Sequence, residues 1–234
     1  MVQFNKNLLT VVLLFLTLLC WSCGKEDAMA DGPSLDSQNF AGIAAFNGIE
    51  GTDNLQLLVD DKVVNKTDEN FQSGGYLSTR TIFPGVRRLV LSSPKGHVYV
   101  KRDLEITPAK FYSIFFYDKD SPEAVVAEDD VIKPENGNLK VRLVNLVSDT
   151  KIKLEYTYKN LGVTEDFKER ITEYKDYSSK EGVNFKVSST DGKYQSMEIP
   201  FKGIDRSINT VIIYPELNKE SSKRELRFKI LEIK

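Results

Sequence analysis

The chain has 234 residues, and its 32 basic and 34 acidic side chains give a net charge of -2. Hydrophobic residues make up 41% and charged residues 28%, a balance typical of globular proteins that argues against general disorder. No segment concentrates positive charge, so nucleic acid is not expected as a partner. The length fits one or two domains of roughly 100–200 residues each.

The N-terminal segment reads as an export signal. Lys6 supplies a positive charge, and the apolar run Leu8–Leu19 is shorter than the roughly 20 residues that a membrane-spanning helix needs. The run leads to Ser22-Cys23, which resembles a bacterial lipobox because a small residue precedes the cysteine that accepts the lipid. We therefore expect residues 1–22 to be a lipoprotein signal peptide and Cys23 to carry a membrane anchor. An uncleaved anchor or an ordinary secretory signal is the alternative, since the two positions before Ser22 depart from the usual lipobox.

The residues after Cys23 indicate where the protein is sent. Lys25, Glu26 and Asp27 resemble the export signal of Bacteroidota surface lipoproteins, which place a lysine and two acidic residues just after the lipidated cysteine. They favour an outer-membrane protein, anchored by lipid and exposed on the cell surface. An ordinary solvated tether, on the periplasmic side, is the alternative. Residues 23–38 are polar and aperiodic, which is typical of a flexible tether.

The body that follows has the period of β-strands. Residues 152–158 (IKLEYTY) alternate apolar with polar side chains, which places the apolar ones on a single face of a strand. Two runs, 111–117 (FYSIFFY) and 210–214 (TVIIY), are apolar at consecutive positions. Such runs predict central strands that are buried on both faces. The body is therefore expected to be all-β.

The body also contains an internal repeat of about 97 residues. Matching positions recur at an offset that holds within one residue: Tyr117 with Tyr214, Gly85 with Gly182, Ser92 with Ser188, and Asn47 with Asn145. The run 134–138 (PENGN) separates two copies, residues 39–133 and 138–234, each with about seven short strands. We predict two tandem immunoglobulin-like antiparallel β-sandwich domains that fold separately. A single larger sandwich or barrel is the alternative.

Three segments carry a resemblance to a known family. Residues 138–146 (NLKVRLVNL) and 44–47 (AAFN) look like the opening strand of the domain-of-unknown-function 4397 family, and residues 55–62 (LQLLVDDK) look like its second strand and turn. Pro84-Gly85-Val86 resembles the short motif that precedes the next strand. The resemblance covers most of residues 40–234 and is better in the first copy. It implies tandem sandwiches on exported lipoproteins and no established chemistry.

The body offers few residues for catalysis. Both cysteines of the chain precede it, and His97, the only histidine, lies on the polar side of a predicted strand. A thiol nucleophile, a Ser-His-Asp triad and a zinc site are therefore not expected. Asp118, Asp120 and Glu123 have the alternating oxygens of a Ca²⁺ loop, but we interpret them as solvated turn residues. We expect no enzymatic activity, no cofactor and no metal.

The second copy is rich in tyrosine, and tyrosines on one sheet face can stack on sugar rings or anchor a partner protein. Tyrosine is also a common strand residue. The candidate ligand platform consists of Tyr156, Tyr158, Tyr174, Tyr177 and Tyr194.

The favoured function is a non-enzymatic surface binding or adhesion module for a glycan or a protein. A structural spacer or an accessory subunit of a surface complex is the first alternative. A glycoside hydrolase that acts through two carboxylates facing each other across a cleft is the second.

Overall fold

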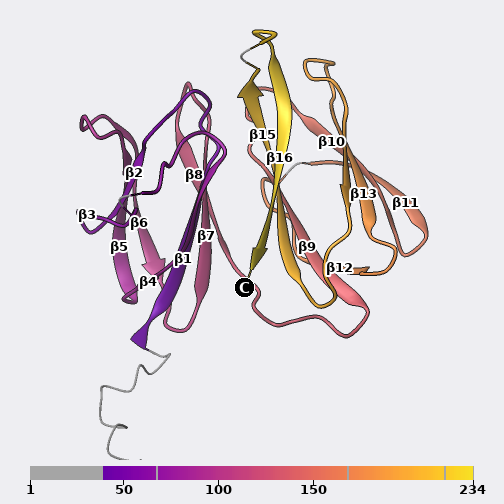
Figure 1. Ribbon diagram of the computed structural model, residues 1–234, viewed down its shortest axis with the longest axis horizontal. Helices are drawn as coiled ribbons and strands as arrows, with labels where there is room; N and C mark the ends of the chain where they lie inside the picture. The colour runs from indigo at the N-terminus through magenta and orange to yellow at the C-terminus, as the bar shows by residue number, and fades with distance from the viewer. Residues whose placement is uncertain (1–38, 67, 168, 219, 234) are drawn as a thin grey trace, which may run out of the picture. The chain divides into compact units, whose positions relative to one another are not determined.

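The computed structural model describes residues 39–66, 68–167, 169–218 and 220–233. These residues form sixteen β-strands in four four-stranded sheets, which make two β-sandwiches (Figure 1). In these ranges no helix is long and apolar enough to cross a membrane. The predicted signal peptide, the lipid attachment residue Cys23, the export signal Lys25-Glu26-Asp27 and the tether lie outside the described residues.

The first sandwich contains eight strands between residues 41 and 128. They are β1 (Ala41–Asn47), β2 (Gln56–Val59), β3 (Lys62–Val63), β4 (Gly75–Ile82), β5 (Gly85–Ser92), β6 (Val98–Ile106), β7 (Phe111–Tyr117) and β8 (Glu123–Glu128). One sheet has the order β4-β1-β7-β8 and the other the order β3-β2-β5-β6. The apolar side chains between the two sheets form the core of this sandwich.

The second sandwich repeats this order strand for strand. Its strands are β9 (Asn138–Asn145), β10 (Ile152–Tyr158), β11 (Leu161–Asp166), β12 (Lys175–Ser178), β13 (Val183–Ser189), β14 (Met197–Phe201), β15 (Ile208–Leu217) and β16 (Arg224–Ile233). Its sheets have the orders β12-β9-β15-β16 and β11-β10-β13-β14, with their own core between them. The expected all-β class with two tandem sandwiches is confirmed.

Each sandwich departs from a purely antiparallel arrangement in one place. β1 pairs in parallel with β7, and β9 pairs in parallel with β15, whereas the remaining strand pairs are antiparallel. Between the two parallel partners the chain passes through the opposite sheet, and such a crossover returns it in the same direction. Side-chain alternation reports which face a residue occupies and not the direction of its neighbour, so the sequence contained no signal for this pairing.

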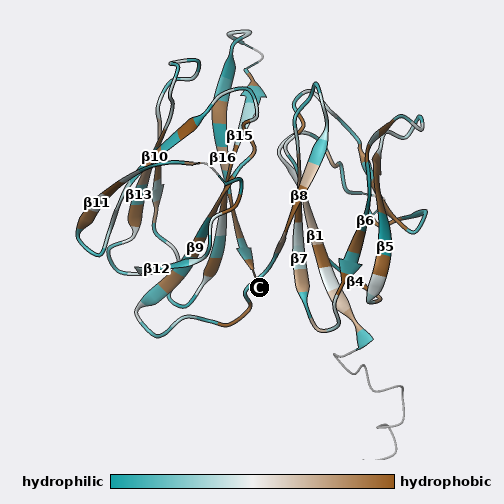
Figure 2. Ribbon diagram, turned by 180° about the vertical axis from the view of Figure 1, so that it is seen from behind, coloured by the Kyte–Doolittle hydropathy of each residue, from teal (hydrophilic) through white to brown (hydrophobic). Residues whose placement is uncertain are grey.

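The two doubly apolar runs are central strands, as predicted, and the structure shows what covers each face. In β7, Ile114 and Phe116 point into the core of the first sandwich, while Phe115 and Tyr117 belong to a separate apolar cluster. In β15, residues 211 and 213 face the second core, and residues 212 and 214 join the same separate cluster. Hydrophobic residues are accordingly concentrated in the strands, as the brown segments of Figure 2 show.

The separate cluster is the interface between the sandwiches. Its buried members come from β1, β7, β9 and β15 and the adjoining residues: Phe46, Phe115, Tyr117, Val144, Leu146, Ile212 and Tyr214. Arg142 of β9, whose side chain is only 2% exposed, forms an ion pair with Asp129 at the end of β8. At another place Arg224 of β16 pairs with Glu50, which follows β1. The interface is therefore apolar at its centre and carries charge pairs that join the two sandwiches.

Candidate functional site

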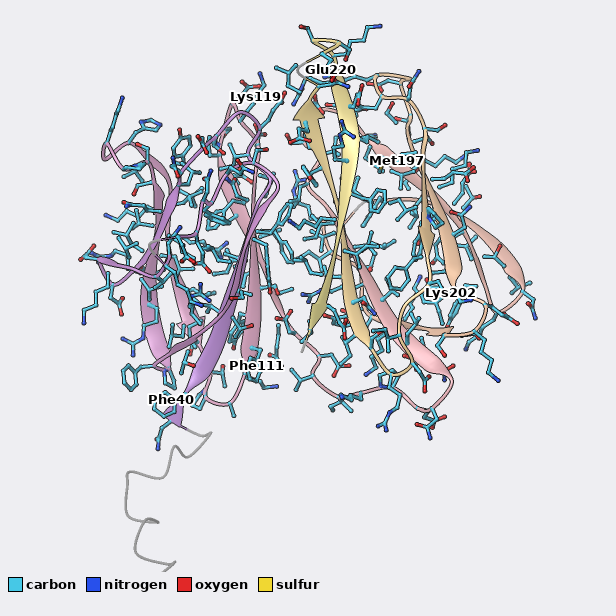
Figure 3. The ribbon with its side chains drawn as sticks, in the orientation of Figure 1. Phe40, Phe111, Lys119, Met197, Lys202 and Glu220 are labelled. Atoms are coloured by element: carbon cyan, nitrogen blue, oxygen red, sulfur yellow. The ribbon has the colours of Figure 1, made fainter. Side chains whose placement is uncertain are left out.

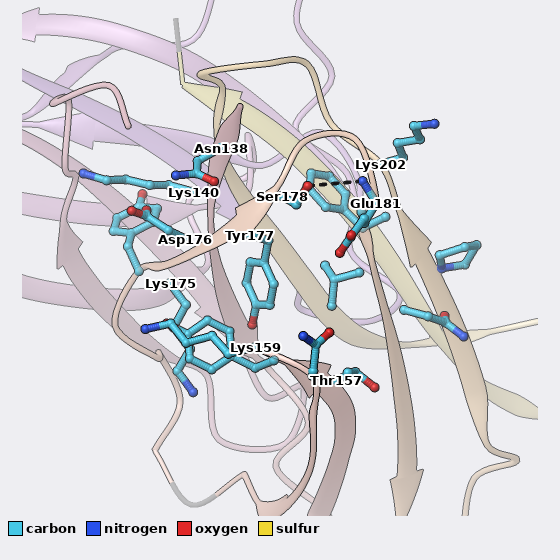
Figure 4. Close-up of a pocket in the computed structure, with 18 of the residues that line it drawn as sticks. Asn138, Lys140, Thr157, Lys159, Lys175, Asp176, Tyr177, Ser178, Glu181 and Lys202 are labelled. Carbon is cyan, nitrogen blue, oxygen red and sulfur yellow. Dashed lines mark hydrogen bonds between the residues drawn. The ribbon is translucent and has the colours of Figure 1, made fainter. Parts of the chain in front are cut away.

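A groove of about 1020 Å³ lies on the second sandwich. Its walls come from the β10–β11 turn, β12, the start of β13 and the end of β14 (Figure 4). β12 is the edge strand of one sheet, and β10 and β11 belong to the other. The groove therefore lies between the two sheets at the end of the sandwich where β9 and β13 begin and β10 and β14 end. We call it the tyrosine–lysine groove, after the side chains that line it.

Two tyrosines form the aromatic side of this groove. The rings of Tyr158 and Tyr177 meet edge to face with their centroids 5.5 Å apart. Tyr177 also packs against Phe185 at 5.8 Å, which fixes the ring from the core side. Burial raises the pKa of Tyr177, so its hydroxyl stays protonated across the physiological range. Tyr158 is partly exposed and presents the ring surface that a ligand can reach.

Lys175 of β12 places a positive charge against these rings. Its Nζ lies 5.1 Å from the ring centroid of Tyr156 and 6.0 Å from that of Tyr158. The amine donates a hydrogen bond to the Tyr156 hydroxyl and lies 3.8 Å from the Glu165 carboxylate. Burial disfavours the charged amine, but the Tyr156 hydroxyl and the Glu165 carboxylate outweigh it and raise the pKa of Lys175. This lysine therefore remains protonated.

Three further lysines line the groove, namely Lys140, Lys159 and Lys202. The Nζ of Lys159 lies 5.1 Å from the centroid of the Tyr158 ring. Together with Lys175, this lysine places two ammonium groups near that ring. Lys140 is paired with Asp130. The lining also contains the carboxylates of Asp130, Asp176 and Glu181. Four lysines against three carboxylates, beside exposed aromatic surface, suit a ligand with flat apolar faces and polar or anionic substituents.

The five predicted platform tyrosines lie at different places in the structure. Tyr158, Tyr174 and Tyr177 line the groove, and Tyr156 lies behind it in contact with Lys175. Tyr194 lies elsewhere: it is buried in the core, and its hydroxyl donates to Asp149 at 2.9 Å. Tyr156 and Tyr177 are also core residues, so only parts of their rings are available for contact. The ligand role of these tyrosines stays a prediction.

Tyr174 connects the groove with the interface between the sandwiches. The Arg142 guanidinium lies 4.9 Å from its ring centroid, and the same guanidinium lies 5.7 Å from the ring of Phe115 in the first sandwich. Burial raises the pKa of Tyr174 to about 12, so its hydroxyl is also protonated. One wall of the groove is thus fixed by a residue that holds both sandwiches together.

Sequence reasoning found the tyrosines and missed the lysines. The signal was present at Lys175, which stands two positions before Tyr177, and at Lys159, which directly follows Tyr158. Lysine on an alternating strand normally marks a solvent-facing position, so these residues were not distinguishable from ordinary surface charge. Only the pairing of β12 with β9, rather than with β10, brings Lys175 over the rings of the other sheet.

The residues considered for catalysis are not assembled into a catalytic site. His97 is exposed, with its ring 4.7 Å from that of Tyr99. Asp118 accepts hydrogen bonds from the backbone N–H groups of Asp120 and Ser121, at 2.9 and 3.1 Å, and so closes its own turn. Within the described ranges no group of three or more His, Cys, Asp or Glu residues is placed to hold a metal ion.

A general acid needs a carboxyl group with a raised pKa. Each Asp or Glu of the described chain with a resolved pKa shift is shifted downward. At Glu69, for example, hydrogen bonds from the Arg80 guanidinium are the main cause of the lowered pKa. These carboxylates are ionised partners of basic or backbone groups, so they do not have the proton affinity that protonation of a leaving group requires.

The match to a protein family lies over the first sandwich. Residues 41–151 match the family "Domain of unknown function (DUF4397)". The resemblance to DUF4397 is thereby confirmed for β1 to β9, a segment that covers the whole first sandwich and the first strand of the second. No curated protein matches the chain.

Two solved structures with similarity to the chain come from Bacteroidota species. A candidate cell adhesion protein from Bacteroides uniformis is 10% identical with a TM-score of 0.24, over 82% of this chain and 97% of that one. The tip fimbrial protein Mfa3 from Porphyromonas gingivalis is 12% identical with a TM-score of 0.26, over 83% of this chain and 99% of that one. At these scores the likeness carries no argument about function, which has to come from the groove.

Proposed function

We propose that this protein is a lipid-anchored, non-enzymatic binding module of the outer membrane, displayed on the cell surface. The lipid is attached at Cys23, and Lys25-Glu26-Asp27 directs the protein to the outer face. The ligand, a glycan or a protein, is held in the tyrosine–lysine groove. The single observation that supports this role is the partly exposed Tyr158 ring with the ammonium groups of Lys159 and Lys175 at 5.1 and 6.0 Å.

The physical reason is that this arrangement offers two kinds of contact at once. The ring face provides apolar area for a sugar ring or an apolar side chain, while the lysines pair with carboxylate, sulfate or phosphate substituents. Because Tyr177 and Tyr156 are held by the core, the groove wall is largely rigid before binding, which reduces the entropy lost on association.

The binding role is tested with the full lipidated protein in detergent on an array of neutral and acidic glycans and of outer-membrane proteins. Tyr158→Ala and Lys159→Ala should each lose the signal of the wild-type protein. Tyr99→Ala, which removes a partly exposed tyrosine from the first sandwich, is the matched control and should retain it. Equal binding by Tyr158→Ala and the wild type would assign the ligand to a different surface.

The anchor and the export signal are tested separately from binding. A fatty-acid probe should label the wild-type protein and not Cys23→Ala. Protease treatment of intact cells should remove the body of the wild type and spare a variant with alanine at positions 25, 26 and 27. Labelling of Cys23→Ala, or identical protease sensitivity of both strains, would contradict the respective assignment.

A structural spacer is the second candidate, and one observation favours it. The interface between the sandwiches buries apolar residues from both and contains the Arg142–Asp129 ion pair. A chain that only had to hold another component off the membrane would need such stiffness and no groove. If cells that carry Tyr158→Ala or Lys159→Ala behave like cells with the wild-type protein, the spacer role is favoured.

A further inference from the structure

Large apolar side chains are exposed at one end of the folded body. Phe83 and Ile132 are 64% and 73% exposed, unusually high values for residues of this size. Phe111, Val131 and Ile204 are also exposed, and Phe111 and Val131 line one hollow together. We call these five residues the apolar end. Soluble proteins usually expose such residues singly.

Backbone contacts place the members on the first sandwich at the end where β1 begins. The ring of Phe83 lies 5.4 Å from that of Phe40, the residue just before β1. Gly42 of β1 pairs with Phe111, and the carbonyl of Phe111 accepts a hydrogen bond from the N–H of Asp129, two residues before Val131. Figure 3 shows Phe40 and Phe111 at the same end of this sandwich, with Lys119 at the opposite end.

The members near the second sandwich lie at the corresponding end. The carbonyl of Ile132 accepts a hydrogen bond from Lys140 Nζ at 2.8 Å, near the start of β9. Ile204 lies in the β14–β15 loop, where its carbonyl accepts from the Ser207 N–H, and the Ser207 carbonyl in turn accepts from the Lys140 N–H. The apolar end is therefore formed by residues near the starts of β1 and β9.

The position of this end follows from the length of the N-terminal segment. Fifteen residues, 24–38, lie between Cys23 and Asn39, and the 16 steps from one Cα to the next span at most about 58 Å in a fully extended chain. A lipid at Cys23 would therefore hold the start of β1 within this distance of the membrane. Such tethering raises the effective concentration of bilayer around the apolar end, so weak individual contacts are sufficient to hold it there.

We propose that the apolar end lies against the lipid bilayer and inserts its side chains into the interfacial region. This proposal rests on the proposed lipid anchor at Cys23. It means that the body is seated on the membrane rather than suspended away from it. The tyrosine–lysine groove, lined in part by Asn138 and Lys202, would then be held near the membrane surface, where its ligand has to be present.

The test uses the absence of tryptophan from the body. Trp21 is the only tryptophan of the chain and is removed with the predicted signal peptide. Phe83→Trp therefore introduces a single fluorophore at the apolar end of the mature protein. Leu217→Trp is the matched control, because Leu217 is an exposed apolar residue at the far end of β15. Each full lipidated variant is reconstituted into phosphatidylcholine vesicles with and without brominated acyl chains.

The expected result for Phe83→Trp is a shift of the emission to shorter wavelength and a loss of intensity with brominated lipid, with neither change in Leu217→Trp. Adding Phe111→Ser and Ile132→Ser to the Phe83→Trp variant should reduce its quenching to the level of the Leu217→Trp control. Both added substitutions are at exposed positions, so the fold is retained, and circular dichroism checks this.

Three outcomes would overturn the proposal. If neither fluorophore is quenched in protein that remains bound to the vesicles, the anchor stands and the apolar end does not contact lipid. If the emission of Phe83→Trp shifts without quenching and only at high protein concentration, a second copy of the chain covers the apolar end. If the protein carries no lipid and leaves the vesicles, the anchor is wrong and the seating on the membrane is wrong with it.

Discussion

Asn47 and Asn145 are equivalent residues that hold the same turn in the two sandwiches. Each is buried at the end of the first strand of its sandwich. The Oδ1 of Asn47 accepts a hydrogen bond from the N–H of Ile49 at 3.0 Å, and the Oδ1 of Asn145 accepts one from the N–H of Val147, also at 3.0 Å. This local turn, in which an asparagine pairs with the backbone two residues on, directs the chain out of one sheet and into the other.

Replacing Asn47 by alanine should destabilise the protein more than replacing Asn145. Asn47 Nδ2 additionally donates to the carbonyl of Phe71 at 3.1 Å and to Thr52 Oγ1 at 3.0 Å. The substitution leaves buried backbone groups without partners, and each such group costs about 1–3 kcal/mol. We expect Asn47→Ala to lower the free energy of unfolding by about 2–4 kcal/mol in denaturant titration. Asn136→Ala, on the exposed linker, is the control and should leave the midpoint unchanged.

The buried ion pair at the interface should be sensitive to the loss of one partner. Arg142 Nε also donates to Thr210 Oγ1 at 3.0 Å, and its Nη1 donates to the carbonyl of Glu128 at 3.2 Å. Arg142→Met leaves the buried Asp129 carboxylate without its cation, which typically destabilises a protein by about 3–5 kcal/mol. Adding Asp129→Asn should recover much of this loss. Equal unfolding free energies for the single and double variants would show that the pair is not coupled.

The two sandwiches should unfold together. Phe115 is buried between them, and truncation of such a residue to alanine costs about 3–5 kcal/mol. The linker is also held in place, because Pro134 is buried and its carbonyl accepts a hydrogen bond from Arg206 Nε at 3.1 Å. These contacts favour cooperative unfolding, and the sequence-based hypothesis that the units fold separately stays a prediction to be measured against it.

Hydrogen exchange of Phe115→Ala provides the measurement. Protection in the cores of both sandwiches should fall by the same free energy, and limited proteolysis of the wild type should not release two resistant halves by cleavage at residues 134–138. Loss of protection confined to the first sandwich would restore the hypothesis of independent folding.

Stability should decrease in acid through specific carboxylates. Hydrogen bonds from the Arg80 guanidinium hold the pKa of Glu69 below its usual value of 4.5. A lowered folded-state pKa contributes stability above the unfolded value, and this contribution is lost as the pH falls through the folded value. We therefore expect the unfolding midpoint to fall below pH 4.5 and the decrease to be shallower in Glu69→Gln. Glu220→Gln, an exposed residue in the β15–β16 hairpin, should follow the wild-type curve.

The sequence by itself determined the class of fold and its duplication. The alternation in residues 152–158 and the doubly apolar runs are local properties that pleated strands impose, and the 97-residue offset between Tyr117 and Tyr214 needs no structure to be seen. The family resemblance in residues 44–47 and 55–62 is likewise carried by short strand segments and was confirmed over residues 41–151. A charged residue on such a strand, however, is predicted from the sequence to face the solvent.

Only the tertiary structure decided which residues pack against the strand faces that point away from the two cores. Arg142 lies in a strand that looks half exposed, yet it is buried because Asp129 and the ring of Tyr174 come from distant segments to pair with it. Lys175 contacts the rings of the opposite sheet because β12 pairs with β9, which brings residues far apart in the chain together. Contacts between residues far apart in the chain depend on how strands are ordered and which faces pack, and neither the order nor the packing is encoded in a local period.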